Sequence, residues 1–337
     1  MMESVASYFE LYLSRQPLRP ASVDIKRRAC QMFCENFGMP TSGPDGEVRC
    51  DLSVNEVTAA MAEDYRTLLA AGRSQVSVNG YLNNFKPFWA WLSRHGYIRN
   101  NPFGTIRPVP IDEEPPRQTF STAELAQLLK VADRFWRIRI CLGLMGARRG
   151  EMLLGVQARD VKLEAETPHI VIGYHRPGKR TIGWGVKGKK LRYLGLPETM
   201  CFDGTVVPLR HHIADRIAEL GHADGYVCLE SCYVEKLLAL QEAGTLGFAE
   251  TRDPTGNFPR RFRRLQERAG IREPRRFHEF RAAFATSMID KFGLSRAADL
   301  LGHSSVETTR KYDRKTQLSL VAEATYVASN AYTSKAR

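Results

Sequence analysis

The chain has 337 residues, 43% of them hydrophobic and 26% charged, so it is long enough for two globular domains with separate cores. It has no run of eighteen apolar residues and no basic start followed by an apolar core, which argues against a membrane span and a secretory signal. The net charge of +12 is uneven: residues 1–108 carry 12 Lys and Arg against 10 Asp and Glu, and the remainder carries 37 against 27. Such a balance suits nucleic acid or an anionic membrane, and it is equally compatible with a merely basic protein.

Seven cysteines, an odd number at irregular spacing in a long chain, do not predict a disulfide framework. A reducing cytoplasm is therefore the expected location. Cys30 and Cys34 are four residues apart, as are Cys228 and Cys232. This spacing favours packing on one helix face over a zinc site, which needs closer pairs and further ligands.

The first hundred residues predict a helical domain. Apolar residues recur at helical spacing in four segments, residues 4–13, 19–38, 52–72 and 77–96. Pro20 suits the first turn of the second helix, and Gly38 suits its end.

Two boundaries of that domain depend on particular residues. Ser53 and Glu56 have the spacing of a capping box, so the third helix is expected to begin there and to end at Gly72. Pro87 either kinks the fourth helix or marks its true start.

A proline-rich stretch, residues 101–118, cannot lie inside a helix or a central strand and predicts a semi-rigid linker. We therefore expect a helical domain over residues 1–106, a linker over 107–118 and a second domain over 119–337. The second domain opens with a capping box from Ser121 to Glu124, followed by two helices.

The second domain mixes strands and helices. Short strands are predicted over 168–175, 181–188 and 190–196, with turns at 176–180 and 187–190. Helical spacing returns at 276–293, 295–303, 305–312 and, in a last amphipathic segment, 317–332. The expected fold class is mostly α with a small β-sheet.

Four segments of this domain carry unusual side chains: "GARRGE" (146–151), "KGKK" (187–190), "HEFR" (278–281) and "LGHSSVETTRKY" (301–312). Each alone is weak evidence, because an arginine pair is usually solvated, His-x-x-Arg is commonly a cap, and a helical tyrosine commonly packs. Together they supply what phosphoryl transfer without a metal needs. Arginines match phosphate oxygens bidentately, tyrosine can form a covalent intermediate, and lysine can protonate a departing alkoxide.

With these four segments the chain resembles the tyrosine recombinase (phage integrase) family. "GARRGEM" is similar to the family's first box, which gives catalytic Arg148 and supporting Glu151. "HEFR" is similar to the second box, and "LGHSSVETTRKY" to the last. These two boxes give His278, Arg281, His303 and the nucleophile Tyr312.

The catalytic lysine of the family lies on a hairpin that "VKGKKLRYLGL" resembles. The family spacing points to Lys187, with Lys189 and Lys190 as alternatives. The sequence departs from the family in three places: Met145 replaces a threonine, Ala147 a leucine, and Arg314 a histidine. The resemblance is weak over residues 221–275. Tyr326 and Tyr332 are competing tyrosines that lack the context of His303.

The resemblance implies a two-domain clamp, C-shaped around duplex DNA. A helical core-binding domain would end near "YIRNNPF", and an α+β catalytic domain of the DNA breaking-rejoining type would follow, with a C-terminal tail helix that docks in cis or on a neighbouring protomer. Arg73 and Lys86 are expected DNA contacts in the first domain. The expected partner is double-stranded DNA with an inverted-repeat core site. The protein would be a monomer or dimer when free and a homo-tetramer in the synaptic complex.

The implied function is site-specific DNA recombination of the integrase type, through a 3′-phosphotyrosine intermediate and with no metal, ATP or other cofactor. Two alternatives remain open: a type IB topoisomerase-like nicking-closing enzyme, and a catalytically silent DNA-binding accessory factor. The expected location is the cytoplasm, in association with the nucleoid, in a prokaryotic or phage context without membrane attachment.

Overall fold

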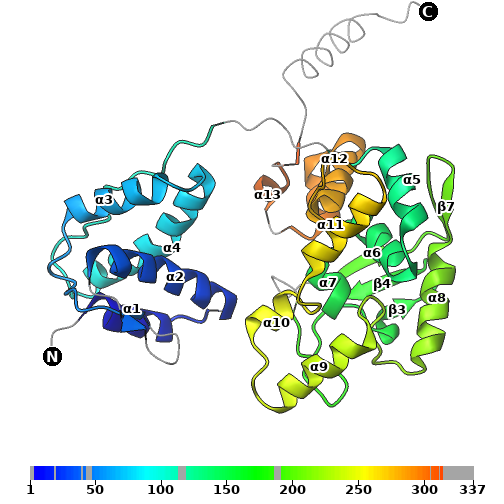
Figure 1. Ribbon diagram of the computed structural model, residues 1–337, viewed down its shortest axis with the longest axis horizontal. Helices are drawn as coiled ribbons and strands as arrows, with labels where there is room; N and C mark the ends of the chain where they lie inside the picture. The colour runs from blue at the N-terminus through cyan, green and yellow to red at the C-terminus, as the bar shows by residue number, and fades with distance from the viewer. Residues whose placement is uncertain are drawn as a thin grey trace, which may run out of the picture. The chain divides into compact units, whose positions relative to one another are not determined.

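The computed structural model describes residues 4–18, 20–38, 41–42, 48–112, 119–185, 191–303, 305–310 and 312–313. Its packing divides the chain into an N-terminal unit, Met1–Pro115, and a C-terminal unit, Pro116–Arg337 (Figure 1). The division falls within the proline-rich stretch. Over the described ranges, no helix combines the length and the hydropathy needed to cross a bilayer.

In the described part of the N-terminal unit, helices surround an aromatic core. Its elements are α1 (Val5–Ser14), α2 (Pro20–Phe37), the paired strands β1 (Thr41–Ser42) and β2 (Val48–Arg49), α3 (Ala59–Ala70) and α4 (Gln75–Arg94). Phe33 of α2 and Phe85 of α4 are fully buried, with ring centroids 5.2 Å apart, and Trp89 stacks on Phe103 at 5.4 Å. Each buried aromatic contributes about 1.5–3 kcal/mol, so this core can hold the unit together.

The start of the third helix was predicted wrongly. Helix α3 begins at Ala59 and is capped by the Thr58 hydroxyl, not by Ser53. The backbone N–H of Ser53 does donate to Glu56 Oε2 at 2.9 Å, as in half of a capping box. However, Ser53 forms a β-bridge with Ser4, which ties this segment to the start of α1 and keeps it out of a helix.

The fourth helix runs through Pro87 without starting there. It extends from Gln75 to Arg94, and the Ser74 hydroxyl caps it. A proline removes one backbone donor. Buried aromatic side chains on both sides of it, at Phe85 and Phe88, compensate for that loss.

The C-terminal unit is mostly helical (Figure 1). Its helices are α5 (Thr122–Val131), α6 (Arg134–Leu144), α7 (Arg149–Leu154), the 3₁₀ turn η1 (Ala158–Asp160), α8 (Leu209–Leu220), α9 (Ser231–Glu242), α10 (Phe248–Arg252), α11 (Phe258–Arg268), α12 (His278–Leu301) and α13 (Val306–Arg310). The capping box from Ser121 to Glu124 is confirmed at the start of α5. Helix α12 is broken at Gly293, whose φ of 80° and ψ of 167° are not helical.

The sheets of this unit differ from the prediction. Strands β3 (Val161–Lys162), β4 (His169–Ile172) and β5 (Arg192–Gly195) form an antiparallel sheet in that order, and a separate pair, β6 (Met200–Phe202) and β7 (Thr205–Val207), was not predicted. Over its described residues 181–185, the predicted middle strand is present only as isolated antiparallel bridges, Thr181 with Gly178 and Trp184 with His175, and the regular sheet pairs β4 with β5. The backbone N–H of Ile182 donates to the Tyr226 hydroxyl and that of Gly183 to the Gln241 side chain, so these donors are not available to a strand.

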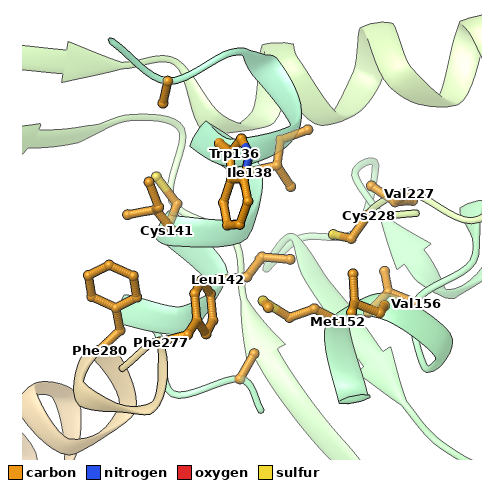
Figure 2. Close-up of a cluster of buried hydrophobic side chains, with 14 of the residues drawn as sticks. Trp136, Ile138, Cys141, Leu142, Met152, Val156, Val227, Cys228, Phe277 and Phe280 are labelled. Carbon is orange, nitrogen blue, oxygen red and sulfur yellow. The ribbon is translucent and has the colours of Figure 1, made fainter. Parts of the chain in front are cut away.

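The first turn of α12 is anchored in the core of this unit. Phe277 and Phe280 lie against α6 near Cys141 and Leu142 (Figure 2). A Cβ atom at Gly143 would lie 3.0 Å from the Phe277 ring, so the close approach depends on glycine. The anchored turn fixes the helix positions that follow each phenylalanine, His278 and Arg281.

Candidate active site

Three segments of the C-terminal unit meet at one place: the loop that follows α6, the first turn of α12, and the chain after α12. The loop turns at Gly146, which has a φ of 86°. A Cβ atom there would lie 2.7 Å from Cδ1 of Phe284, so both conformation and space require glycine. This turn places the Gly146 carbonyl and the following Arg148 next to α12.

Arg281 joins the three segments. Its guanidinium donates to the carbonyl oxygens of Gly146 and Leu301, the latter at 2.7 Å, and lies 3.1 Å from His303 Nε2. The side chain is 1% exposed. Burial, followed by repulsion from Arg192 and Arg148, lowers the pKa of Arg281 to about 10, so it remains a cation at neutral pH. A buried cation with unused N–H groups is suited to binding an anion.

His303 lies between Arg281 and helix α13. Its Nε2 faces Arg281, and its Nδ1 is 2.8 Å from the hydroxyl of buried Thr309. Burial first, and then the charges of Arg281 and Arg148, lower the pKa of His303 to about 4. The imidazole is therefore neutral at neutral pH.

Tyr312 is held by its backbone and its hydroxyl. The carbonyl of Tyr312 accepts from Thr286 Oγ1 on α12 at 2.9 Å, and the hydroxyl oxygen lies 3.0 Å from His278 Nε2. The ring is nearly parallel to that of His303, with centroids 6.1 Å apart. Although Tyr312 follows His278 by 34 positions in the sequence, the two side chains form a hydrogen-bonded pair.

The environment of His278 favours the neutral imidazole. Burial lowers its pKa below the usual 6.5, and the charges of Arg281 and Arg148 act in the same direction, while Glu279 opposes them. A neutral imidazole at hydrogen-bond distance can accept the proton of the Tyr312 hydroxyl.

Glu151 supports the loop that follows α6 and carries Arg148, called here the arginine loop. Its carboxylate is 2% exposed and accepts from the backbone N–H of Arg148 at 2.8 Å and from Arg192 at 2.6 Å. The Arg148 guanidinium lies 3.8 Å from the other carboxylate oxygen and remains one third exposed. Arg148 is therefore the more accessible of the two predicted arginines, and Arg281 is the buried one.

A cavity of about 610 Å³ opens beside these residues. Arg148 and His278 line it together with basic and aromatic side chains of α11 and the segment that follows, including Phe258, Phe262 and Arg263. The site thus adjoins a basic, partly apolar recess large enough for part of a nucleotide chain.

The structure brings together Arg148, Glu151, His278, Arg281, His303 and Tyr312. Lys187, Lys189 and Lys190 lie outside the described residues, as do Tyr326, Tyr332 and the tail segment 317–332. The two residues expected to bind DNA from the first domain lie in the N-terminal unit. There Arg73 lies over the Tyr81 ring, and Lys86 Nζ donates to the Ile106 carbonyl at 2.6 Å.

Sequence reasoning missed two residues of the site, Arg192 and Thr309. Arg192 is 6% exposed at the start of β5, where the sequence shows only a strand. Residues of this strand alternate between buried and exposed, and the alternation places Arg192 on the buried face. That placement of a charged residue was the signal available in the sequence. Thr309 precedes Tyr312 by three residues. It lies on the buried face of the short helix α13 and is fully buried.

The cysteines and the potential metal ligands are further candidates for parts of a site. All seven cysteines are free, and Cys30 and Cys34 are buried on α2, as expected of packing residues. Cys228 precedes α9 rather than sharing it with the exposed Cys232. Within the described ranges, no three or more His, Cys, Asp or Glu side chains are grouped so that they could hold a metal ion.

Comparisons with known proteins find one family match. Residues 206–318 match the model of the phage integrase family, a range that includes the second and last boxes. A comparison with curated proteins finds no match.

Solved structures share the fold at low identity. Tn1549 transposon integrase in complex with a circular intermediate DNA aligns with a TM-score of 0.65 and 15% identity, over 96% of this chain and 99% of that chain. A lambda integrase dimer bound to a COC′ core site aligns with a TM-score of 0.59 and 13% identity, over 93% and 97%. A lambda integrase tetramer bound to a Holliday junction aligns with a TM-score of 0.60 and 13% identity, over 92% and 77%. The chain therefore has the mostly helical fold of these integrases, as its sequence predicted.

Proposed function

We propose that this chain, whose residues 206–318 match the phage integrase family, is a site-specific DNA recombinase that cuts and rejoins DNA through a 3′-phosphotyrosine intermediate. One observation carries the proposal: the Tyr312 hydroxyl lies 3.0 Å from His278 Nε2, beside the buried Arg281 that also contacts His303. This arrangement joins a nucleophile, a base and a cation at one point, which a packing tyrosine does not require.

The proposed reaction is a transfer of one phosphoryl group between two oxygens. Tyr312 Oη attacks the scissile phosphorus while His278 Nε2 accepts the hydroxyl proton. The tyrosine–phosphorus bond forms, and the bond from phosphorus to the 5′-oxygen breaks. Lys187 is the proposed acid that protonates the leaving 5′-oxygen. Because the phosphotyrosine conserves the ester bond, rejoining requires no ATP, and the arginines supply the positive charge that a metal ion would otherwise supply.

The charge of the site suits that transfer. Three arginines, Arg148, Arg192 and Arg281, stand against the carboxylates of Glu151 and Glu279, and the two histidines are neutral, which leaves a positive local balance. The pentacoordinate state carries one negative charge more than the phosphodiester. Preorganised cations therefore stabilise it more than the ground state, and in enzymes such electrostatic stabilisation usually lowers the barrier more than any other single effect.

The proposed partner is double-stranded DNA with an inverted-repeat core site. Lambda integrase has been crystallised as a dimer on a core site and as a tetramer on a Holliday junction. By analogy, we propose four protomers of this chain in the synaptic complex and one or two when free. The N-terminal unit is proposed to bind the core DNA, and the proposed location is the bacterial or phage-infected cytoplasm, at the nucleoid.

A trapping experiment tests the proposal. A duplex nicked near the scissile phosphate loses its short 5′-hydroxyl product after cleavage, so a covalent protein–DNA adduct accumulates. We expect adduct with the natural chain, none with Tyr312→Phe, and unchanged adduct with Tyr174→Phe, which alters an exposed tyrosine on the same unit. Adduct that persists in Tyr312→Phe overturns the assignment and directs attention to Tyr326.

The products separate the proposed recombinase from a nicking-closing enzyme. A plasmid with two core sites yields recombinant circles with a recombinase, whereas a topoisomerase-like enzyme only relaxes it. A protein that binds the core site but forms no adduct would be an accessory factor.

A further inference from the structure

Arg192 lies at this site, but the proposed reaction assigns it no contact with the phosphate or the leaving group. It is the first residue of β5, and its side chain is buried at the site, with 6% of the residue exposed. Its Nη1 donates to Glu151 Oε2 at 2.6 Å, and its Nη2 to the Gly146 carbonyl at 3.3 Å. The same carbonyl accepts from Arg281, and the same Glu151 oxygen accepts from the backbone of Arg148.

Arg192 also contacts the turn that precedes His303. A Cβ atom at Gly302 would lie 2.6 Å from the Arg192 Cδ, and Gly302 has a φ of 64°. The turn can therefore pass over the arginine only with glycine at this position. One side chain thus touches the loop of Arg148, shares the Gly146 carbonyl with Arg281, and supports the segment that carries His303.

Stability alone does not explain this arginine. Its Nε is buried and finds no hydrogen-bond partner among the described residues. A buried ion pair is often no more stabilising than apolar side chains of similar volume, because the charges lose their hydration. The Nε of Arg216, elsewhere in the unit, is also buried without a partner, so what distinguishes Arg192 is its contact with the Gly146 carbonyl, Glu151 and the turn before His303.

We propose that Arg192 is a positioning residue of the strand-transfer site, which fixes the Gly146 carbonyl and the Glu151 carboxylate so that Arg148 and Arg281 are directed at the same phosphate. The inference rests on the proposed recombinase function. Arg192 need not touch DNA: it acts through the loop and the carboxylate. Its charge has a second effect, because it is among the cations that lower the pKa of His303.

The test compares Arg192→Met and Arg192→Lys with a control, Arg216→Met. Arg216 is a buried arginine of the same unit, bonded to the carbonyls of Tyr226 and Leu229. We expect Arg192→Met to slow adduct formation by on the order of 10²-fold, the loss typical of a small displacement of catalytic groups. Duplex affinity should be unchanged. Arg192→Lys keeps the charge but loses the two-pronged contact, so its rate should fall between the two.

Two further readouts separate positioning from stability. Removing the charge in Arg192→Met should raise the pKa of His303, followed by NMR titration without DNA, while Arg192→Lys and Arg216→Met should leave it in place. Because Arg192 is proposed to act through Glu151, Glu151→Gln combined with Arg192→Met should cleave no more slowly than the slower single variant.

The outcomes are distinct. Wild-type cleavage by folded Arg192→Met overturns the inference and leaves the recombinase proposal standing. An equal loss in Arg216→Met also overturns it, because the loss would then reflect stability. A natural chain that forms no adduct overturns the recombinase proposal itself, whatever the titration of His303 shows.

Discussion

The hydroxyl of Thr309 lies 2.8 Å from Nδ1 of His303. The other ring nitrogen, Nε2, lies 3.1 Å from Nη2 of Arg281, and an arginine can only donate. Nε2 must therefore be the acceptor, so the proton of the neutral ring is on Nδ1 and is donated to Thr309. The threonine thereby selects the tautomer that orients the guanidinium of Arg281.

Thr309→Val should weaken the site without removing any group that touches the phosphate. Valine keeps the shape but leaves the Nδ1 proton buried without an acceptor, which costs about 1–3 kcal/mol. We expect adduct formation to slow by about tenfold, since each 1.4 kcal/mol is about a factor of ten. The neighbouring Thr308 is exposed, so Thr308→Val is the matched control and should cleave normally. Equal rates for both variants would show that the tautomer of His303 does not matter.

The rate of cleavage should rise with pH and level off below neutrality. His278 accepts a proton only when it is neutral, and its pKa lies below 6.5 because of burial and the nearby arginines. Activity is therefore complete above pH 6.5 and is lost as the pH falls through the pKa of His278. His278→Gln should cleave on the order of 10²–10⁴ times more slowly and lose this dependence. A fall in rate at low pH that persists in the glutamine variant assigns the titration to another group.

The residues of the site were easier to predict than their support. Arg148, His278, Arg281, His303 and Tyr312 stand in segments that resemble the boxes of a known family, so the resemblance marks them. Arg192 lies in a strand whose sequence is ordinary. Its contacts with Glu151 and the Gly146 carbonyl form only in the folded chain. The segment 181–185 forms only isolated bridges for a similar reason. The backbone donors of Ile182 and Gly183 are taken by side chains distant in sequence, a tertiary effect that no local pattern contains.

Cleavage should proceed fully in excess chelator. In the proposed mechanism, Arg148 and Arg281 stabilise the charge that divalent ions stabilise in metal-dependent nucleases. Adduct formation with and without chelator should therefore agree within error. Activity that disappears with chelator and returns with magnesium would reject the mechanism.

DNA affinity should fall steeply with salt, because binding of a polyanion releases counterions. The slope of log affinity against log salt should be about −0.9 per phosphate contact. Arg73→Ala should reduce the slope by about one contact. Lys86→Ala should reduce it less, because that ammonium is hydrogen-bonded to the Ile106 carbonyl. A nearly flat salt response of the natural chain would contradict a DNA clamp.

The last prediction concerns Lys187 as the general acid. An alkoxide is a poor leaving group because its conjugate acid is weak, with the pKa of water, about 15.7, as a guide. A general acid should therefore accelerate cleavage of natural DNA by on the order of 10²–10⁴. A thiolate leaves far more easily, since a thiol has a pKa of about 8.5. Lys187→Ala should thus cleave ordinary DNA slowly and recover on DNA with sulfur at the 5′-bridging position.

The matched control for that rescue is Arg281→Ala. Its proposed role concerns the non-bridging oxygens, so sulfur at the bridging position should not restore its activity. If Lys187→Ala is equally slow on both substrates, Lys187 is not the acid. The same comparison at Lys189 and Lys190 then shows whether a neighbouring lysine carries the proton. If neither is rescued, His278 becomes the first suspect, because its Nε2 would hold the proton taken from Tyr312 and could return it to the leaving oxygen.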